Sequence, residues 1–283
     1  MSPLDCAGKL VDLTQPQVMG ILNVTPDSFS DGGKFVSVDA AIRQAQMMVD
    51  EGVAIIDIGG ESTRPGASPV SVQEELDRVI PVIEALRKLP VPLSIDTSKP
   101  QVMKDAVSAG ASMINDVNAL RAEGAIDIVA TLNVPVCLMH MQGGPRTMQQ
   151  TPLYNDVVKE VKDFLSDRVD ACTNAGIPKE RLVIDPGFGF GKTPEHNFTI
   201  VKHLDVLTDL GCPVLVGVSL KSTIGALLDD APVEERLYAS VALAAIAVLH
   251  GASIIRAHDV KPTIDAVRAG QAVAYGYNRK DQT

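Results

Sequence analysis

The sequence predicts a single (β/α)8 barrel, the TIM barrel, with a short N-terminal cap. Three observations support this fold class: eight short apolar runs recur along the chain, stretches of helical length separate most of them, and nearly every run ends in a polar residue. Strands of a parallel barrel are buried on both faces, and their C-terminal ends share the rim where the active site lies. The runs are Val18–Leu22, Ala54–Ile58, Val91–Ile95, Ala111–Ile114, Val134–Met139, Leu182–Ile184, Val214–Val218 and Ala252–Ile255.

The segments around these runs carry signals of their own. Residues 1–16 are expected to form a short extended cap at the N-terminal end of the barrel. Ser71 followed by Glu74 is a capping box at a helix start, and Gly110 is suited to a helix end. Helices are expected over Val72–Lys88, Gln101–Ser108, Val157–Asn174 and Glu234–His250. Three loops that leave strand ends are long, as binding loops often are, namely 23–37, 59–71 and 140–154.

The composition fits one globular domain over residues 1–283. A content of 46% hydrophobic and 21% charged residues is typical of a globular α/β protein with a large core. The net charge of −10 argues against a nucleic-acid or anionic-membrane partner, because phosphate backbones bind to basic patches. A small anionic substrate remains possible, since a few local cations suffice to bind it.

Further features suggest a cytoplasmic protein. We find no uncharged apolar span of about 18 residues, so no transmembrane helix is expected. The N-terminal residues lack the basic and apolar regions of a signal peptide. The four cysteines have neither metal-ligand nor disulfide spacing, so we expect buried free thiols in a reducing compartment; they are Cys6, Cys137, Cys172 and Cys212.

Three residues at strand ends can recognise a flat heterocycle. Asp96, Asn115 and Asp185 follow three different strands, so they converge on the barrel axis. Two carboxylates and an amide can pair with the N–H donors and carbonyl of a heterocycle edge. Each could instead make a structural hydrogen bond or a helix cap. The glycine-rich run 185–192 lacks the spacing of a P-loop, and we expect it to bring Phe190 close to the flat ligand.

A second group of rim residues can bind an anion. Arg256 and His258 follow the last run, and arginine matches phosphate oxygens in a bidentate manner. Arg256 could instead pair with a carboxylate, and His258 could donate to a backbone carbonyl. Lys221 can reach the barrel axis or lie in solvent, and His140 is a further rim candidate. The remaining members of the anion site are Asn23, Thr63 and Arg64.

Seven longer motifs run in unbroken order along nearly the whole chain. They are Gly20–Gly33, Asp57–Gly66, Ser94–Thr97, Ile114–Asp116, Met139–Gly143, Asp185–Lys192 and Arg256–Asp259. Together they resemble the motifs of the dihydropteroate synthase family. That family joins 6-hydroxymethyl-7,8-dihydropterin diphosphate to 4-aminobenzoate, releases pyrophosphate and makes 7,8-dihydropteroate for folate synthesis.

The resemblance implies a role for each matched residue. It implies that Mg2+ binds at Asn23 and that Lys221 and Ser222 lie near the aminobenzoate pocket. It also implies a homodimer formed through the later helices and sensitivity to sulfonamides. The implied pterin ligands are Asp96, Asn115, Asp185, Lys221 and Arg256, and the residues around the diphosphate are Thr63, Arg64, Arg256 and His258. The implied catalytic set is Asn23, Asp96, Lys221, Arg256 and His258.

The chain departs from the family pattern in two places. Leu220 stands where the family usually has an arginine, and 238–240 reads Tyr-Ala-Ser where the family commonly has a glycine. We therefore expect reduced but real activity. One alternative is a pterin-binding paralogue with weak or no synthase activity. Another is a pterin-dependent methyltransferase, which needs no diphosphate site; the anion-binding residues argue against it.

Overall fold

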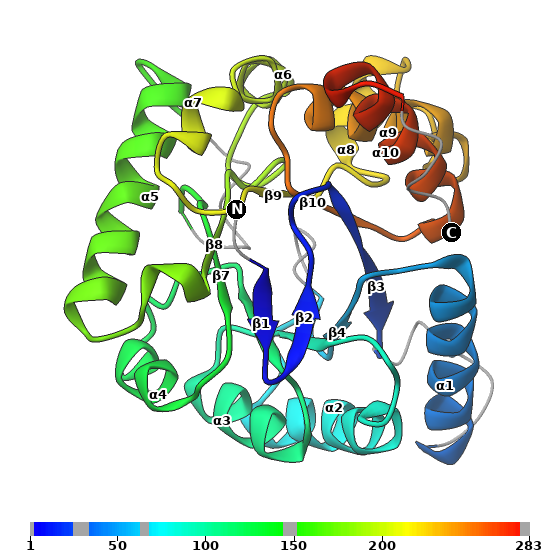
Figure 1. Ribbon diagram of the computed structural model, residues 1–283, viewed down its shortest axis with the longest axis vertical. Coiled ribbons are helices and arrows are strands. Elements are labelled where there is room, and N and C mark those ends of the chain that lie inside the picture. The colour runs from blue at the N-terminus through cyan, green and yellow to red at the C-terminus, as the bar shows by residue number, and fades with distance from the viewer. Residues whose placement is uncertain (1–2, 25–33, 63–67, 144–151, 278–283) are drawn as a thin grey trace.

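Eight parallel strands form a closed barrel in the computed structural model (Figure 1), which describes residues 3–24, 34–62, 68–143 and 152–277. The order of neighbours is β8-β7-β6-β5-β4-β3-β10-β9. A parallel bridge between Ile184 and Val214 joins the two ends of this order and closes the barrel. The strands are β3 (Gln17–Asn23), β4 (Ile55–Gly59), β5 (Leu93–Asp96), β6 (Met113–Asp116), β7 (Val136–Met139), β8 (Leu182–Asp185), β9 (Leu215–Val216) and β10 (Ile254–Ala257). All eight predicted strands and the TIM-barrel class are confirmed.

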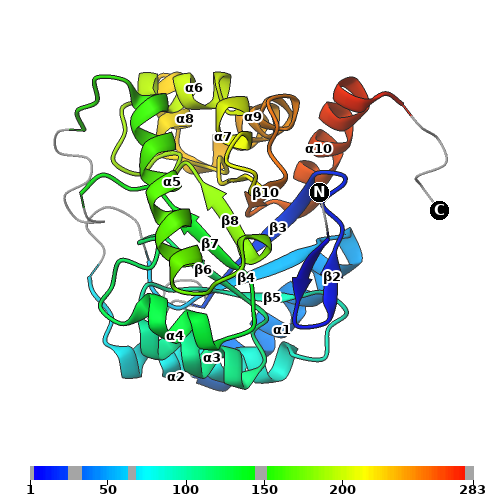
Figure 2. The same ribbon diagram turned by 60° about the vertical axis from the view of Figure 1, so that its left-hand side comes forward.

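Helices surround the strands. In Figure 2, α2, α3 and α4 lie together on one side of the barrel, and α6, α8 and α9 lie on the opposite side. The helices are α1 (Lys34–Glu51), α2 (Val72–Leu86), α3 (Pro100–Ala109), α4 (Ala125–Thr131), α5 (Val157–Asn174), α6 (Pro194–Lys202), α7 (Asp205–Thr208), α8 (Ser222–Leu227), α9 (Leu237–Leu249) and α10 (Val260–Tyr275). Short 3-10 turns are η2 (Lys179–Arg181) and η3 (Val233–Glu235).

The helix starts show where local sequence signals work and where they do not. The predicted capping box is present, since Ser71 Oγ accepts from the Glu74 N–H at 3.2 Å and Glu74 Oε2 accepts from the Ser71 N–H at 2.9 Å. The last predicted helix begins three residues later than expected. Pro232 opens the 3-10 turn η3, and the Arg236 N–H bonds to the Val233 carbonyl instead of continuing an α-helix.

A small hairpin covers the N-terminal end of the barrel interior. Strands β1 (Leu4–Cys6) and β2 (Lys9–Val11) pair in antiparallel fashion, and Gly8 has the positive φ of +88° that the turn needs. Leu4 and Val11 pack in one cluster with inward-pointing strand residues such as Met19. The predicted cap is therefore confirmed, in the form of a hairpin. The hairpin fills the N-terminal end of the interior, and the polar strand ends lie at the opposite rim.

The main core lies between the strands and the helices. Ile56 and Ile58 of β4 are fully buried, as are Val79 and Ile83 of α2, because α2 packs its apolar face on the barrel. All four cysteines are free and buried, as predicted. Among the described helices, none has the length and apolar character required to cross a bilayer.

Candidate active site

Arg256 of β10 is held by carboxylates from two other strands. Its Nε donates to Asp57 Oδ2 of β4 at 2.6 Å, and its Nη2 donates to Asp96 Oδ2 of β5 at 2.7 Å. Burial alone would lower the pKa of Arg256, but the two carboxylates outweigh this effect and hold the pKa above its ordinary value. The guanidinium is therefore charged and fixed in orientation. The sequence left open whether Arg256 pairs with a carboxylate, and it pairs with two.

Asp57 is a site residue that our sequence reasoning missed. Its Oδ2 also accepts from Asn115 Nδ2 of β6 at 2.9 Å, so one carboxylate oxygen orients both Arg256 and Asn115. The side chain is fully buried. The sequence did contain a sign of this role, namely an acidic residue inside an otherwise apolar strand. Such a residue is almost never fully buried unless it is paired, so Asp57 could have been expected to have a charged or polar partner.

Two rim carboxyl groups have pKa values near neutrality. Burial raises the pKa of Asp96 to about 7, while the charge of Arg256 opposes the shift. Burial likewise raises the pKa of Asp185 to about 6, opposed by the N–H of Gly187 at 2.7 Å and by nearby Lys221. A buried carboxylate gains from any donor that a ligand brings. This environment therefore favours a ligand edge that is rich in N–H groups.

Lys221 and Phe190 meet beside the glycine-rich loop. The Lys221 Nζ lies 4.3 Å from the centroid of the Phe190 ring, within cation–π range. A Cβ on Gly189 would come within 3.3 Å of Lys221 Cδ, so this glycine leaves room for the lysine stem. Ser222 begins α8 directly after Lys221 and is exposed. Lys221 is thus directed toward the rim rather than free in solvent.

His258 is oriented by a serine that the sequence analysis did not assign. The Ser219 Oγ lies 3.0 Å from His258 Nδ1 and also accepts from the His258 backbone N–H at 3.2 Å. Ser219 lies between β9 and α8, and His258 directly follows β10. Because β9 and β10 are neighbours in the barrel, the two residues come together. The hydroxyl fixes the plane of the imidazole ring.

Asn23 ends β3 beside Asp96. A Cβ on Gly59 would lie 3.6 Å from Asn23 Oδ1 and 3.8 Å from Asp96 Oδ2, so the missing side chain leaves space between the two. No cluster of three or more acidic, histidine or cysteine side chains suited to a metal occurs among the described residues. A single amide oxygen nevertheless fits Mg2+, which prefers oxygen ligands and is commonly held by water and substrate phosphates with few protein groups.

The predicted residues Thr63 and Arg64 lie outside the described residues, but contacts fix both ends of the segment that carries them. Glu61 Oε1 accepts from the Val70 N–H at 3.1 Å, which joins the two ends. Lys99, from the loop after β5, pairs with Glu61 and with Glu75 of α2. These contacts tie the base of the segment to the Asp96 side of the rim.

His140 does not act as a rim base. Burial, together with the charges of Lys192 and Arg121, lowers its pKa to about 2. Its Nδ1 lies 2.9 Å from the Lys192 Nζ. His140 is therefore a neutral hydrogen-bond acceptor for a buried lysine.

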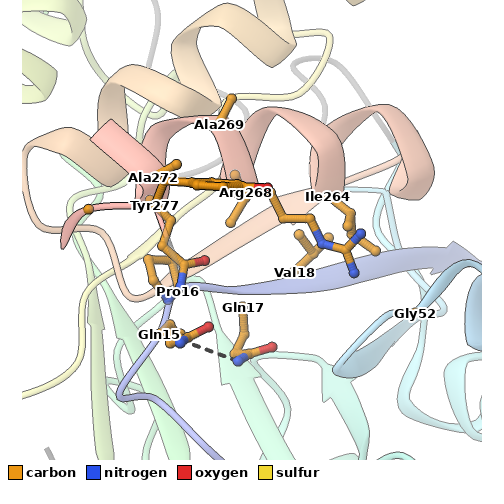
Figure 3. Close-up of a pocket in the computed structure, with 13 residues that line it drawn as sticks. Gln15, Pro16, Gln17, Val18, Gly52, Ile264, Arg268, Ala269, Ala272 and Tyr277 are labelled. Carbon is orange, nitrogen blue, oxygen red and sulfur yellow. Dashed lines mark hydrogen bonds between the residues drawn. The ribbon is translucent and has the colours of Figure 1, made fainter. Parts of the chain in front are cut away.

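A cavity of about 410 Å³ lies away from this rim, between the start of β3 and α10 (Figure 3). Gln17 on its wall donates to the Gln15 carbonyl at 3.3 Å, and Arg268, Gln271 and Tyr277 of the α10 region add to the polar lining. None of the predicted site residues lines this cavity. The chemistry-bearing side chains therefore identify the candidate site, and the cavity belongs to the N-terminal end of the barrel.

Comparison with known proteins agrees with this geometry. Residues 19–258 match the family of pterin binding enzymes. The dihydropteroate synthase of Escherichia coli (strain K12) is 52% identical over 266 residues, which are 94% of each chain. The chain belongs to the dihydropteroate synthase family.

Two solved dihydropteroate synthases of Xanthomonas albilineans extend the match to three dimensions. One, with 4-aminobenzoic acid, has a TM-score of 0.91, 53% identity and coverage of 97% of this chain and 99% of that one. The other, in complex with 7,8-dihydropteroate, has a TM-score of 0.86 and 47% identity, and the match covers 97% of this chain and 99% of that one.

Leu220, the departure from the dihydropteroate synthase pattern, is held through its backbone. Its N–H donates to Ser240 Oγ at 3.0 Å, and its carbonyl accepts from Arg236 Nη1 at 3.3 Å. Gly225 makes room for this guanidinium, because a Cβ there would lie 2.6 Å from Arg236 Nη2. Leu220 has a positive φ of 56°, a conformation that costs about 1–2 kcal/mol for a residue other than glycine. The loop therefore keeps its shape without an arginine side chain at 220.

Proposed function

We propose that this rim synthesises 7,8-dihydropteroate from 6-hydroxymethyl-7,8-dihydropterin diphosphate and 4-aminobenzoate. The observation that carries the proposal is the convergence of Asp57, Asp96, Asn115 and Arg256 into one buried network, in a chain about half identical to dihydropteroate synthases. Asp185 and Lys221, which follow β8 and β9, belong to the same rim, and the charges of Lys221 and Arg256 both lower the pKa of Asp185. No observation favours the silent paralogue or the methyltransferase.

The pterin is bound by the buried polar groups. Asp185 accepts hydrogen bonds from the amidine-like edge of the ring, and Asp96, Asn115 and Lys221 pair with the remaining polar atoms. A carboxylate that takes two parallel N–H bonds fixes the ring plane as well as adding affinity. Arg256 lies against the face of the ring. Its two carboxylate partners support this role, since they fix the plane of the guanidinium.

The diphosphate lies toward His258 and Arg256, with Thr63 and Arg64 completing the anion site. During the reaction the bond between the pterin methylene carbon and the diphosphate oxygen breaks, and its electron pair leaves with pyrophosphate. Mg2+ bound near Asn23 would supply further positive charge to the leaving oxygens. His258 and Arg256 stabilise the same developing charge from fixed positions.

The aminobenzoate enters beside Lys221 and Ser222. Its amino nitrogen attacks the methylene carbon, a C–N bond forms, and the nitrogen loses a proton. The electron-rich pterin delocalises positive charge on the carbon, so the step requires no strong base. Orientation of the two reactants supplies much of the rate enhancement. As analogues of 4-aminobenzoate, sulfonamides compete for this pocket.

The chain works as one domain over residues 1–283, as a cytoplasmic homodimer. Apolar side chains exposed on the later helices support a dimer contact there, since large exposed apolar patches mark interaction sites. They include Leu227, Tyr238, Ile246, Leu249 and Val273. Buried free thiols agree with a reducing compartment.

A single assay tests the function. The pure protein is incubated with both substrates and Mg2+, and pyrophosphate is measured together with 7,8-dihydropteroate. We expect equal amounts of the two products, and none when 4-aminobenzoate is omitted. Release of pyrophosphate no faster than without protein would instead indicate the silent paralogue.

A further inference from the structure

Lys192 is a buried cation that the mechanism above does not use. It follows the glycine-rich loop after β8 and is only 2% exposed. Its Nζ lies 3.0 Å from the Gly187 carbonyl oxygen, 2.9 Å from the Phe190 carbonyl oxygen and 2.9 Å from His140 Nδ1. The His140 carbonyl oxygen is a fourth, longer contact at 3.5 Å. An ammonium group has three N–H donors, and the three closer acceptors can take all of them. Lys192 thus joins both ends of the loop to the end of β7.

The loop that Lys192 holds carries two groups of the site. The Gly187 N–H donates to Asp185 Oδ1 at 2.7 Å, so the loop backbone fixes the pterin-binding carboxylate. The Phe190 ring lies under the Lys221 ammonium. Gly187 has a φ of +70°, and a Cβ there would overlap the His140 carbonyl oxygen, so the loop packs directly on β7. One ammonium group therefore connects Asp185, Phe190 and His140.

Burying the Lys192 ammonium costs free energy, because none of its hydrogen-bond partners carries a negative charge. They are carbonyl oxygens and a ring nitrogen rather than a carboxylate. Burial lowers the pKa of Lys192 to about 7, and the charge of Asp185 opposes that shift. In turn, Lys192 is one of the charges that lower the pKa of Asp185. An apolar side chain would avoid this desolvation cost but would remove both the three hydrogen bonds and the charge.

We propose that Lys192 is a positioning residue for pterin recognition: its ammonium holds the loop that orients Asp185 and Phe190, and it adds a positive charge on the Asp185 side of the site. This inference rests on the proposed function, because it assigns Asp185 to the pterin. Lys192 acts through Asp185 and need not touch the substrate. Its removal is therefore expected to affect the pterin step more than the aminobenzoate step.

The electrostatic part of the proposal depends on all charges near the pair. Asp185 is influenced by Lys192, by Lys221 after β9 and by Arg256 of β10, and it lies near the Cys137 thiol of β7. Lys192 faces Asp185 and the neutral His140. Without Lys192, two of the three cations remain, so Asp185 stays ionisable but its pKa rises above about 6. Pterin binding then fails at a higher pH than in the parent protein.

Two substitutions separate shape from charge. Lys192→Met keeps the length but removes donors and charge, and Lys192→Gln keeps two donors without the charge. Lys202→Met, at an exposed lysine on α6, is the matched control. Calorimetry would measure the affinity for 6-hydroxymethylpterin, which lacks the diphosphate and cannot react, across the pH range that spans the pKa values of Asp185 and Lys192. Steady-state assays would give KM for both substrates.

We expect Lys192→Met to weaken pterin affinity about tenfold or more, as for a buried hydrogen-bonded group left unsupported, with KM for 4-aminobenzoate nearly unchanged. The pH below which pterin affinity falls, the acid limb of the binding profile, is expected to be higher in both variants than in the parent protein. The loss of affinity is expected to be smaller in Lys192→Gln than in Lys192→Met. Parental affinity in a folded variant, or weaker affinity with an unmoved acid limb, would overturn the proposal. If Lys192→Met does not fold, Lys192→Gln decides. Failure of the parent protein to form product would refute the proposed function instead.

Discussion

Removing the Asp57 carboxylate tests whether one buried group orients the pterin side of the site. Asp57→Ala takes away the partner of Arg256 Nε and of Asn115 Nδ2, which lie 2.6 and 2.9 Å from the same oxygen. Arg256 keeps Asp96 as its second partner. Breaking one side of a buried ion pair costs about 3–5 kcal/mol of unfolding free energy. The retained Asp96 contact places the expected loss at the lower end of that range.

The activity is expected to fall further than stability alone explains. With one carboxylate gone, the guanidinium can rotate about its remaining contact, and a misplacement of about 1 Å can reduce turnover by about 100-fold. Denaturant unfolding measures the first effect, and pyrophosphate release under conditions where the variant is folded measures the second. Asp50→Ala is the control, because Asp50 is exposed on α1 and bonds only to Gln46 among the described contacts.

The control defines the refuting result. A surface substitution such as Asp50→Ala is expected to change stability by no more than about 0.5 kcal/mol and to leave turnover intact. If Asp57→Ala matches it in both measurements, the buried network does not position the site. Asp57→Asn adds a check on charge: since Asp57 helps to raise the pKa of Asp96, the pKa of Asp96 should fall in that variant.

Three further outcomes follow from the geometry. Asp185→Asn should weaken pterin binding by about 1–3 kcal/mol by calorimetry, and in the parent protein binding should weaken as pH falls through about 6, where Asp185 gains a proton. Leu220→Arg should raise turnover, because Ser240 and Arg236 already hold the loop through the backbone of residue 220 and the substitution adds only the missing guanidinium; an unchanged rate would show that the missing arginine does not reduce activity. Chelation of Mg2+ should lower turnover while leaving the affinity for 6-hydroxymethylpterin unchanged.

The barrel could be predicted from the sequence because its strands are buried on both faces. Runs such as Val134–Met139 stay apolar without alternation and then end abruptly in a polar residue. Parallel topology then requires those polar residues to share a rim, so the sequence alone predicted that Asp96, Asn115 and Arg256 lie at the same end of the barrel. The late start of α9 was not predicted, because Arg236, which ends the 3-10 turn after Pro232, is held by the distant Leu220 carbonyl, and local sequence does not show that contact.

The pairing of side chains across the rim could not be predicted. Asp57 falls in the middle of an apolar run. It can pair with Arg256, 199 residues away, only because the relative shift of the barrel strands brings the two side chains face to face. The neighbouring positions of β9 and β10 follow from their consecutive order in a barrel, but the contact between the side chains of Ser219 and His258, 39 residues apart, depends on how the residues after the two strands are turned. Spacing along a chain predicts which strand end a residue occupies, but the twist and tilt of the barrel decide which residue it faces.

The charges at the rim explain how the two halves of one substrate can be recognised separately. Arg256 is paired with Asp57 and Asp96, so most of its positive charge is compensated within the protein. A guanidinium whose charge is compensated in this way is better suited to pack against a neutral ring than to neutralise a diphosphate alone. Under the proposed function, the diphosphate is therefore expected to obtain most of its charge compensation from the other members of the proposed anion site, namely His258, Thr63, Arg64 and Mg2+ near Asn23. Pterin binding by itself needs none of these groups, which is why it is expected to persist when the metal is removed.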